Sequence, residues 1–210
     1  MKHLKMLGLV VMAAAAFVAF FAPGSASATV LCKEYKTPCP VASLYPAGLT
    51  VSAGLEAGAS STLKTTGGEA ITACKASTVS LKTKNAGKKE ELVEGEGSVL
   101  TLNECSVTTT VVNAGQFSIQ YVPSQPTETR ANLWISSLET SVKLFGSVTC
   151  TYGGPNTYLG TLTSGAPAGL DVKTVLTRTA GGFLCPTTVV WEGNYIISAP
   201  EDLNFKEETK

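Results

Sequence analysis

Histidine is almost absent from this chain of 210 residues, because His3 is its only one. Histidine is the side chain that most often acts as a general base, and it is the commonest metal ligand. Catalysis by a Ser-His-Asp or Cys-His arrangement is therefore excluded for the rest of the chain. The six cysteines include no Cys-x-x-Cys pair, so the sequence does not indicate a zinc site or a closely spaced redox pair.

Aspartate is nearly as scarce, with Asp171 and Asp202 as its only members. Glutamates gather in the glycine-bounded segment Lys88–Glu96, which lacks the alternating oxygen ligands of a compact calcium loop. We expect a solvated charged loop there, and we expect no metal and no cofactor. A hydrolase that pairs Asp171 with a glutamate is kept as an alternative.

The charges balance, with 16 lysines and arginines against 16 aspartates and glutamates. Nucleic-acid binding depends on a basic face that releases counterions, so no nucleic-acid partner is expected. The same balance argues against electrostatic binding to an anionic membrane through a cluster of basic residues.

The first 28 residues have the order of a secretory signal peptide. A short stretch with two lysines precedes the apolar run Met6–Ala22, which Pro23-Gly24 ends, and Ala26-Ser27-Ala28 is a small-x-small cleavage site. We expect residues 1–28 to be removed; an uncleaved anchor is the alternative. The protein is then secreted, extracellular or at the cell surface, without stable membrane insertion after cleavage. Lipidation of Cys32 is disfavoured, because Leu31 precedes it.

Apolar and polar residues alternate over many short segments separated by glycine-rich turns. Phe117, Ile119 and Tyr121 alternate with polar residues, which is typical of a half-buried strand. The segment Thr187–Ser198 is apolar on both parities, and we expect it to be covered on both faces. The fold class predicted is all-β: a single antiparallel β-sandwich over residues 29–205, followed by a charged tail at 206–210. Two small subdomains divided at Val122–Arg130 are the alternative.

The cysteines are expected to form structural disulfides, since all six follow the cleavage site and meet an oxidising compartment. Six cysteines allow fifteen pairings. The close spacing of the first two and the near-equal spacing of the next two pairs favour consecutive pairing. The predicted disulfides are Cys32–Cys39, Cys74–Cys105 and Cys150–Cys185.

Aromatic residues are the best candidates for ligand contact, because exposed rings on a sheet can stack on sugar rings. Tyr152 and Tyr158 flank the turn Gly153–Asn156, and we predict that both are exposed. Trp134 is a further candidate. Trp191 lies in the most apolar segment and is predicted to be in the core.

Several motifs together resemble a group of secreted, six-cysteine, β-rich proteins of high-GC Gram-positive soil bacteria. They include Tyr45-Pro46-Ala47-Gly48, Cys150-Thr151-Tyr152-Gly153 and Gly181-Gly182-Phe183-Leu184-Cys185-Pro186. The resemblance implies a source and a β-rich fold, and no activity is assigned to that group.

The function expected from these observations is that of a secreted, non-enzymatic cell-envelope or extracellular-matrix protein that binds polysaccharide or another surface protein. The alternative is a self-associating surface or biofilm component, because threonine-rich strands of low charge can pair edge to edge. That alternative predicts an uncovered edge strand near Ser106–Val112.

Overall fold

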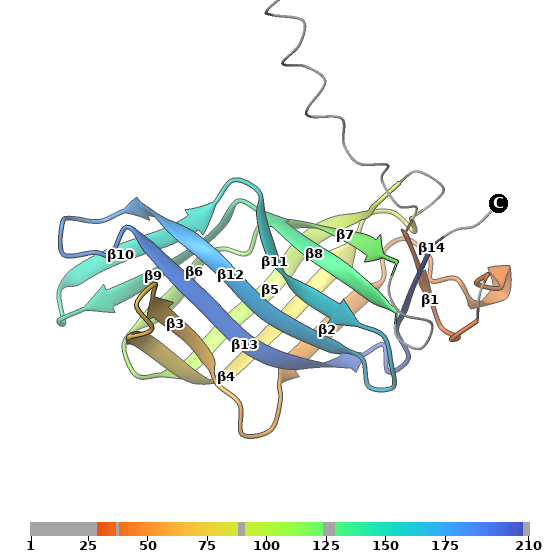
Figure 1. The fold of residues 1–210 in the computed structure, drawn as a ribbon, viewed down its shortest axis with the longest axis horizontal. Coiled ribbons are helices and arrows are strands. Elements are labelled where there is room, and N and C mark those ends of the chain that lie inside the picture. The colour runs from red at the N-terminus through yellow and green to blue at the C-terminus, as the bar shows by residue number, and fades with distance from the viewer. Residues whose placement is uncertain (1–28, 37, 88–90, 124–128, 208–210) are drawn as a thin grey trace, which may run out of the picture.

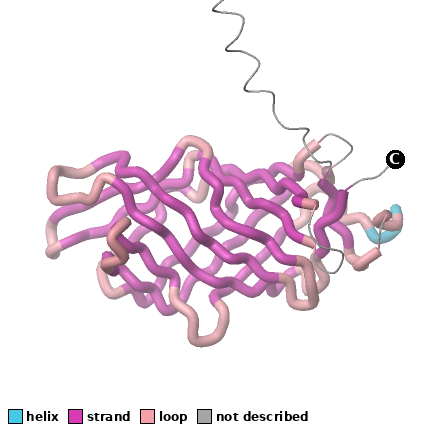
Figure 2. Tube along the Cα trace, in the orientation of Figure 1, coloured by secondary structure: helices cyan, strands magenta, loops and turns pink. Residues whose placement is uncertain are grey.

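The computed structural model describes residues 29–36, 38–87, 91–123 and 129–207. The predicted signal peptide lies outside these residues, as do residues 88–90 of the segment expected to form a charged loop. The end of that segment, Val93–Glu96, belongs to a strand, so the expectation of a loop was wrong there. About two thirds of the described chain is strand, with a single 3-10 turn, η2, at Val41–Ser43 (Figure 2). No helix of the described chain is long and apolar enough to cross a membrane.

The strands follow one another with short connections (Figure 1). In order they are β1 (Thr29–Cys32), β2 (Thr50–Leu55), β3 (Ser61–Thr65), β4 (Ala70–Thr83), β5 (Val93–Cys105), β6 (Thr109–Asn113), β7 (Gln116–Val122), β8 (Arg130–Ser136), β9 (Leu138–Leu144), β10 (Val148–Gly154), β11 (Thr157–Thr163), β12 (Gly169–Ala180), β13 (Thr188–Ala199) and β14 (Asn204–Glu207). The prediction of an all-β protein is confirmed.

The larger of the two sheets closes on itself. Its strand order is β2-β13-β3-β4-β5-β7-β8-β11-β12-β10-β9-β6. Within this order, β13 also pairs with β12, so the strands from β13 through β12 form a closed ring. An antiparallel barrel of 8 strands results, in place of the two facing sheets expected of a sandwich. Inward and outward side chains alternate alike in both architectures, so the sequence pattern could not separate them.

In one place in the barrel wall, two short strands lie one after the other between the same two neighbouring strands. Both β2 and β3 pair with β4 and with β13. The strands β8 and β9 are separated by Ser137 alone, a residue with a φ of 59°, but they pair with different strands: β8 with β7 and β11, and β9 with β10 and β6. The strands on both sides of the proline-containing segment 122–130 therefore belong to one sheet.

One contiguous apolar core fills the barrel. The prediction for Trp191 is confirmed, since its ring is buried there and its Nε1–H donates to Ser61 Oγ at 2.8 Å. Tyr195 joins the same network, 3.2 Å from Ser61 Oγ and 3.0 Å from Ser77 Oγ. Only one face of β13 is buried, because Val190 is half-exposed. The expectation of cover on both faces was wrong.

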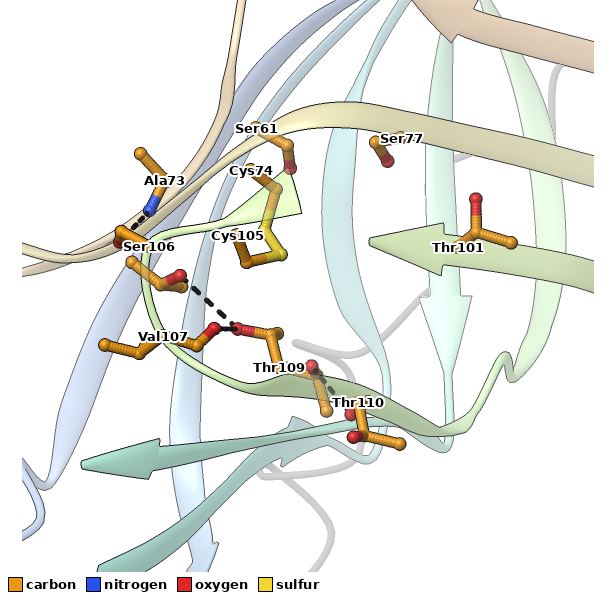
Figure 3. The surroundings of a disulfide bond; sticks show 12 residues. Ser61, Ala73, Cys74, Ser77, Thr101, Cys105, Ser106, Val107, Thr109 and Thr110 are labelled. Atoms are coloured by element: carbon orange, nitrogen blue, oxygen red, sulfur yellow. Dashed lines mark hydrogen bonds between the residues drawn. A yellow bond between two sulfur atoms is a disulfide. The ribbon is translucent and has the colours of Figure 1, made fainter. Parts of the chain in front are cut away.

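The three disulfides join consecutive cysteines, as the spacing predicts. They are Cys32–Cys39, Cys74–Cys105 and Cys150–Cys185, with sequence separations of 7, 31 and 35 residues. Cys74 and Cys105 stand directly opposite each other on β4 and β5 (Figure 3). Beside this disulfide the Ala73 N–H donates to Ser106 Oγ at 3.1 Å. Such cross-links are typical of an oxidising environment.

A small second sheet closes one end of the barrel. In it β1 and β14 pair in antiparallel fashion (Figure 1), and the buried Leu31 and Phe205 belong to the main core. Lys206 is only 3% exposed. The expectation that the charged tail begins at residue 206 was therefore wrong, because pairing with Val30 holds Lys206 in the strand. Residues 208–210 lie outside the described chain.

Candidate functional site: an aromatic hollow on the outer wall

Four strands of the wall place four outward side chains in one row. The register pairs Glu94 with Ser118, Ser118 with Trp134, and Trp134 with Tyr158. Residues directly opposite on neighbouring strands lie on the same face of a sheet. The row therefore runs across β5, β7, β8 and β11, on the side away from the core.

Trp134 and Tyr158 form the aromatic half of this row. Their ring centroids are 5.6 Å apart with an interplanar angle of 69°, which is an edge-to-face contact. The Tyr158 hydroxyl lies 2.6 Å from Thr161 Oγ1, so the phenol ring is held by contacts at both ends. Both side chains are half-exposed. The structure thus brings together two of the three aromatic residues predicted to contact a ligand.

A hollow of about 370 Å³ lies beside Trp134. Ser118 and Ser136 are small outward residues at its floor, and the larger Trp134 and Gln116 stand opposite them in the register. The full lining consists of Lys84, Glu94, Gly95, Gln116, Phe117, Ser118, Trp134, Ser136 and Asn156. An indole wall and a rim of amide, hydroxyl and carboxylate groups meet in one concave surface.

Charges of both signs stand at the β5 end of the hollow. Lys84 Nζ lies 3.4 Å from Glu96 Oε2, with both side chains more than half exposed. The Asn85 side chain accepts from the Glu94 N–H at 2.8 Å and donates to the Leu92 carbonyl at 3.0 Å. These bonds fix the backbone from which Glu94 projects.

Tyr152 is not part of this surface, which corrects the prediction that it is exposed. It is 0% exposed and faces the core from β10. Burial raises the pKa of the Tyr152 hydroxyl above its usual value, and the positive charge of Arg178 opposes that shift. The hydroxyl has no hydrogen-bond partner among the described residues.

The interior leaves little room for a ligand. A cavity of about 20 Å³ lies among inward side chains of β3, β4, β5 and β13, with Trp191 and Leu102 in its lining. This volume holds on the order of one water molecule. The outer hollow is therefore a better candidate site than the interior.

Within the described residues, Asp171 does not stand opposite another carboxylate. Asp171 is exposed on β12, opposite Asn194 and Thr161. Within the described residues, no group of three or more His, Cys, Asp or Glu side chains could hold a metal ion.

One strand of the larger sheet lies at the end of its order. Among the described residues β6 pairs with β9 alone, and β5 pairs with β7 over Val93–Glu96 but forms no ladder with β6. Val112 on β6 and Val99 on β5 are exposed. This is the region where the sequence predicts an uncovered edge.

Comparison with known proteins identifies no relative: no family model matches the chain, and neither does any curated protein or solved structure. The site must therefore be judged by its chemistry. The indole face of Trp134 can stack on an apolar ring face. The rim groups Gln116, Asn156 and Glu94 can bond to hydroxyl groups around such a ring.

Proposed function

We propose that this is a secreted, non-enzymatic protein that binds a cell-envelope polysaccharide in the hollow beside Trp134. The observation that carries the proposal is the row from Glu94 to Tyr158, in which Trp134 contacts the Tyr158 ring and also lines a hollow together with polar groups. A secretory leader in the sequence and three disulfides support a place outside the cytoplasm.

A sugar ring offers an apolar face of C–H groups and an edge of hydroxyls, which matches the two halves of the row. Strands lie about 4.8 Å apart, so a row over four strands spans roughly 14 Å. This length favours a chain of sugars over a single ring. Glu94 is the only carboxylate among the described residues that line the hollow, whereas glycoside hydrolysis needs two facing carboxylates, so we propose that the rim holds the ligand without turning it over.

The test is retention of the purified protein on insoluble envelope polysaccharide from its own source. Trp134→Ala should lower affinity about tenfold or more, because aromatic contacts of this kind contribute on the order of 1–2 kcal/mol. Tyr158→Ala should have a smaller effect, since Tyr158 supports the indole edge. Tyr35→Ala is the matched control: Tyr35 is an exposed aromatic residue that does not line the hollow.

Two results would contradict the proposal. One is equal retention of the wild type and Trp134→Ala, with melting temperatures that show both folded. The other is release of soluble sugars by the wild type that Asp171→Asn abolishes, which would support the hydrolase alternative.

Self-association is a second candidate, and the position of β6 at the end of the sheet order favours it. Thr109–Asn113 carries no charge, so two copies of this strand would meet without like-charge repulsion. Sedimentation velocity over a range of concentrations tests this idea. A concentration-dependent dimer that Val112→Lys abolishes would support it, and a monomer at all concentrations would refute it.

A further inference from the structure

Two loops at one end of the barrel carry large apolar side chains that are exposed to solvent. The β9–β10 loop presents Phe145, which is 82% exposed. The β12–β13 loop presents Phe183 and Leu184, which are 93% and 49% exposed. Both loops lie at the left end of the long axis in Figure 1, opposite β1 and β14. We call Phe145, Phe183 and Leu184 the apolar tip.

The β12–β13 loop is braced, so its exposed residues are held in place. The disulfide Cys150–Cys185 ties the loop to β10. Arg178 Nη1 donates to the Gly182 carbonyl at 2.7 Å and to the Cys185 carbonyl at 2.6 Å. Gly181 has a φ of 119°, and a Cβ there would lie 2.6 Å from Cys185 Sγ, so only glycine fits this close approach.

The two loops adjoin each other. Cys185 Sγ lies 3.8 Å from the Thr149 carbonyl oxygen, and Thr149 stands opposite Lys143, two residues before Phe145. The disulfide therefore fastens the second loop to the base of the first. An apolar surface that is already rigid loses little conformational entropy when it binds.

The charges nearest to the tip along the chain are positive. Neither loop contains a charged residue, and Lys143 is the only charged residue between Glu139 and Asp171. Arg178 is the last charged residue before the β12–β13 loop. Two acids lie at the same end of the barrel. Glu69 is in the β3–β4 turn, where Thr65 pairs with Val189 at the start of β13, and the exposed Glu104 lines one hollow with Lys143 and Gly146.

We propose that the apolar tip inserts into the interface of a lipid surface with anionic headgroups. Both loops protrude at the end of the long axis (Figure 1), a position that suits insertion into a deformable bilayer. Aromatic side chains are favoured at the boundary between headgroups and acyl chains. The exposed Lys143, two residues before Phe145, is then placed at headgroup level, where a cation attracts anionic lipid.

The experiment is flotation of the purified protein with two kinds of vesicle, phosphatidylcholine alone and phosphatidylcholine with one third phosphatidylglycerol. Wild type should float with the anionic vesicles and several-fold less with the neutral ones. Phe183→Ser should lower partitioning about tenfold or more, since a buried phenylalanine contributes this much to transfer. Phe145→Ser should act in the same direction. Lys143→Gln should lower binding to the anionic vesicles alone.

Val175→Ser is the matched control, because Val175 is an exposed apolar residue on the outer face of β12, away from the loops. It should bind vesicles as the wild type does. Three results would overturn the proposal: no flotation of folded wild type, equal losses in Phe183→Ser and Val175→Ser, or a dimer in solution that Phe183→Ser converts to monomer. The last result would assign the tip to a second copy of the chain.

Discussion

The two ends of the barrel differ in how far they bury large apolar side chains. At one end β1 and β14 pair across the opening, and Phe205 is 0% exposed. At the other end Phe183 stands in water on a braced loop. A buried phenylalanine in a paired strand stabilises the fold. An exposed phenylalanine on a fixed loop can contact a partner outside the molecule.

The largest test of this contrast replaces the same side chain at both ends. Phe205→Ala should lower the free energy of unfolding by about 3–5 kcal/mol, because it leaves a cavity in a packed core. Phe183→Ala should change it by less than about 0.5 kcal/mol, because the ring buries almost nothing. Urea denaturation of both variants and the wild type measures the difference. Similar losses in the two variants would show that the β12–β13 loop is packed against the protein in solution.

The disulfides extend the comparison to the covalent links. Chain-entropy arguments give about 3.8 kcal/mol for Cys150–Cys185, whose loop has 35 residues, and about 2.4 kcal/mol for Cys32–Cys39, with 7 residues. Paired substitution by serine at each disulfide should reproduce that order in unfolding free energy. Losing Cys150–Cys185 should also reduce vesicle binding, because the tip is then no longer held in place. A greater loss of stability at Cys32–Cys39 would reverse the expected order.

Much of the fold could be predicted from local patterns. Alternation around Phe117 and Ile119 indicated β7, and the spacing of the cysteines indicated all three disulfides. Trp191 could be placed in the core because its neighbours are apolar. Each of these inferences depends on residues close together in the chain or on a simple spacing rule.

Closure of the barrel could not be predicted in this way, because it depends on β13 pairing with strands more than 120 residues earlier, as in Trp191 with Leu63. The contact of Trp134 with Tyr158 depends likewise on the register of two strands. The error on Tyr152 was avoidable. Cys150 is buried in its disulfide, and a residue two positions further along a strand faces the same side.

The balanced total charge of the chain does not show where its charges lie. Balanced composition argued against attraction to an anionic membrane, yet the stretch around Phe145 contains Lys143 and no acid. At the other end, Lys206 is buried, with its Nζ 3.8 Å from the centroid of the Tyr35 ring. Lysine therefore has different roles at the two ends of the molecule.

The smallest expected effect separates these two lysines by pH. Burial lowers the pKa of Lys206 from its usual value, so between its pKa in the folded protein and about 10.4 the unfolded chain binds more protons. The cost of burying the charge is fully present below the folded pKa and declines as the pH rises through it. Wild type should therefore gain stability, on the order of 1 kcal/mol, relative to Lys206→Met as the pH approaches 10.

The difference between wild type and variant is the quantity to measure, by urea midpoints from pH 7 to 9.5. Tyrosines with raised pKa values, such as Tyr195, affect both proteins alike and cancel. In Lys206→Met, loss of the contact with the Tyr35 ring costs about 0.5–1 kcal/mol, whereas removal of a buried charge stabilises the variant at neutral pH. Because these two effects oppose each other, the stability difference at pH 7 does not test the prediction. The change of that difference with pH does. Lys143→Met, which removes an exposed lysine at the other end of the barrel, is the control variant. A flat difference for Lys206→Met would mean that its ammonium group reaches water and that this end of the barrel is less closed than β1 and β14 make it.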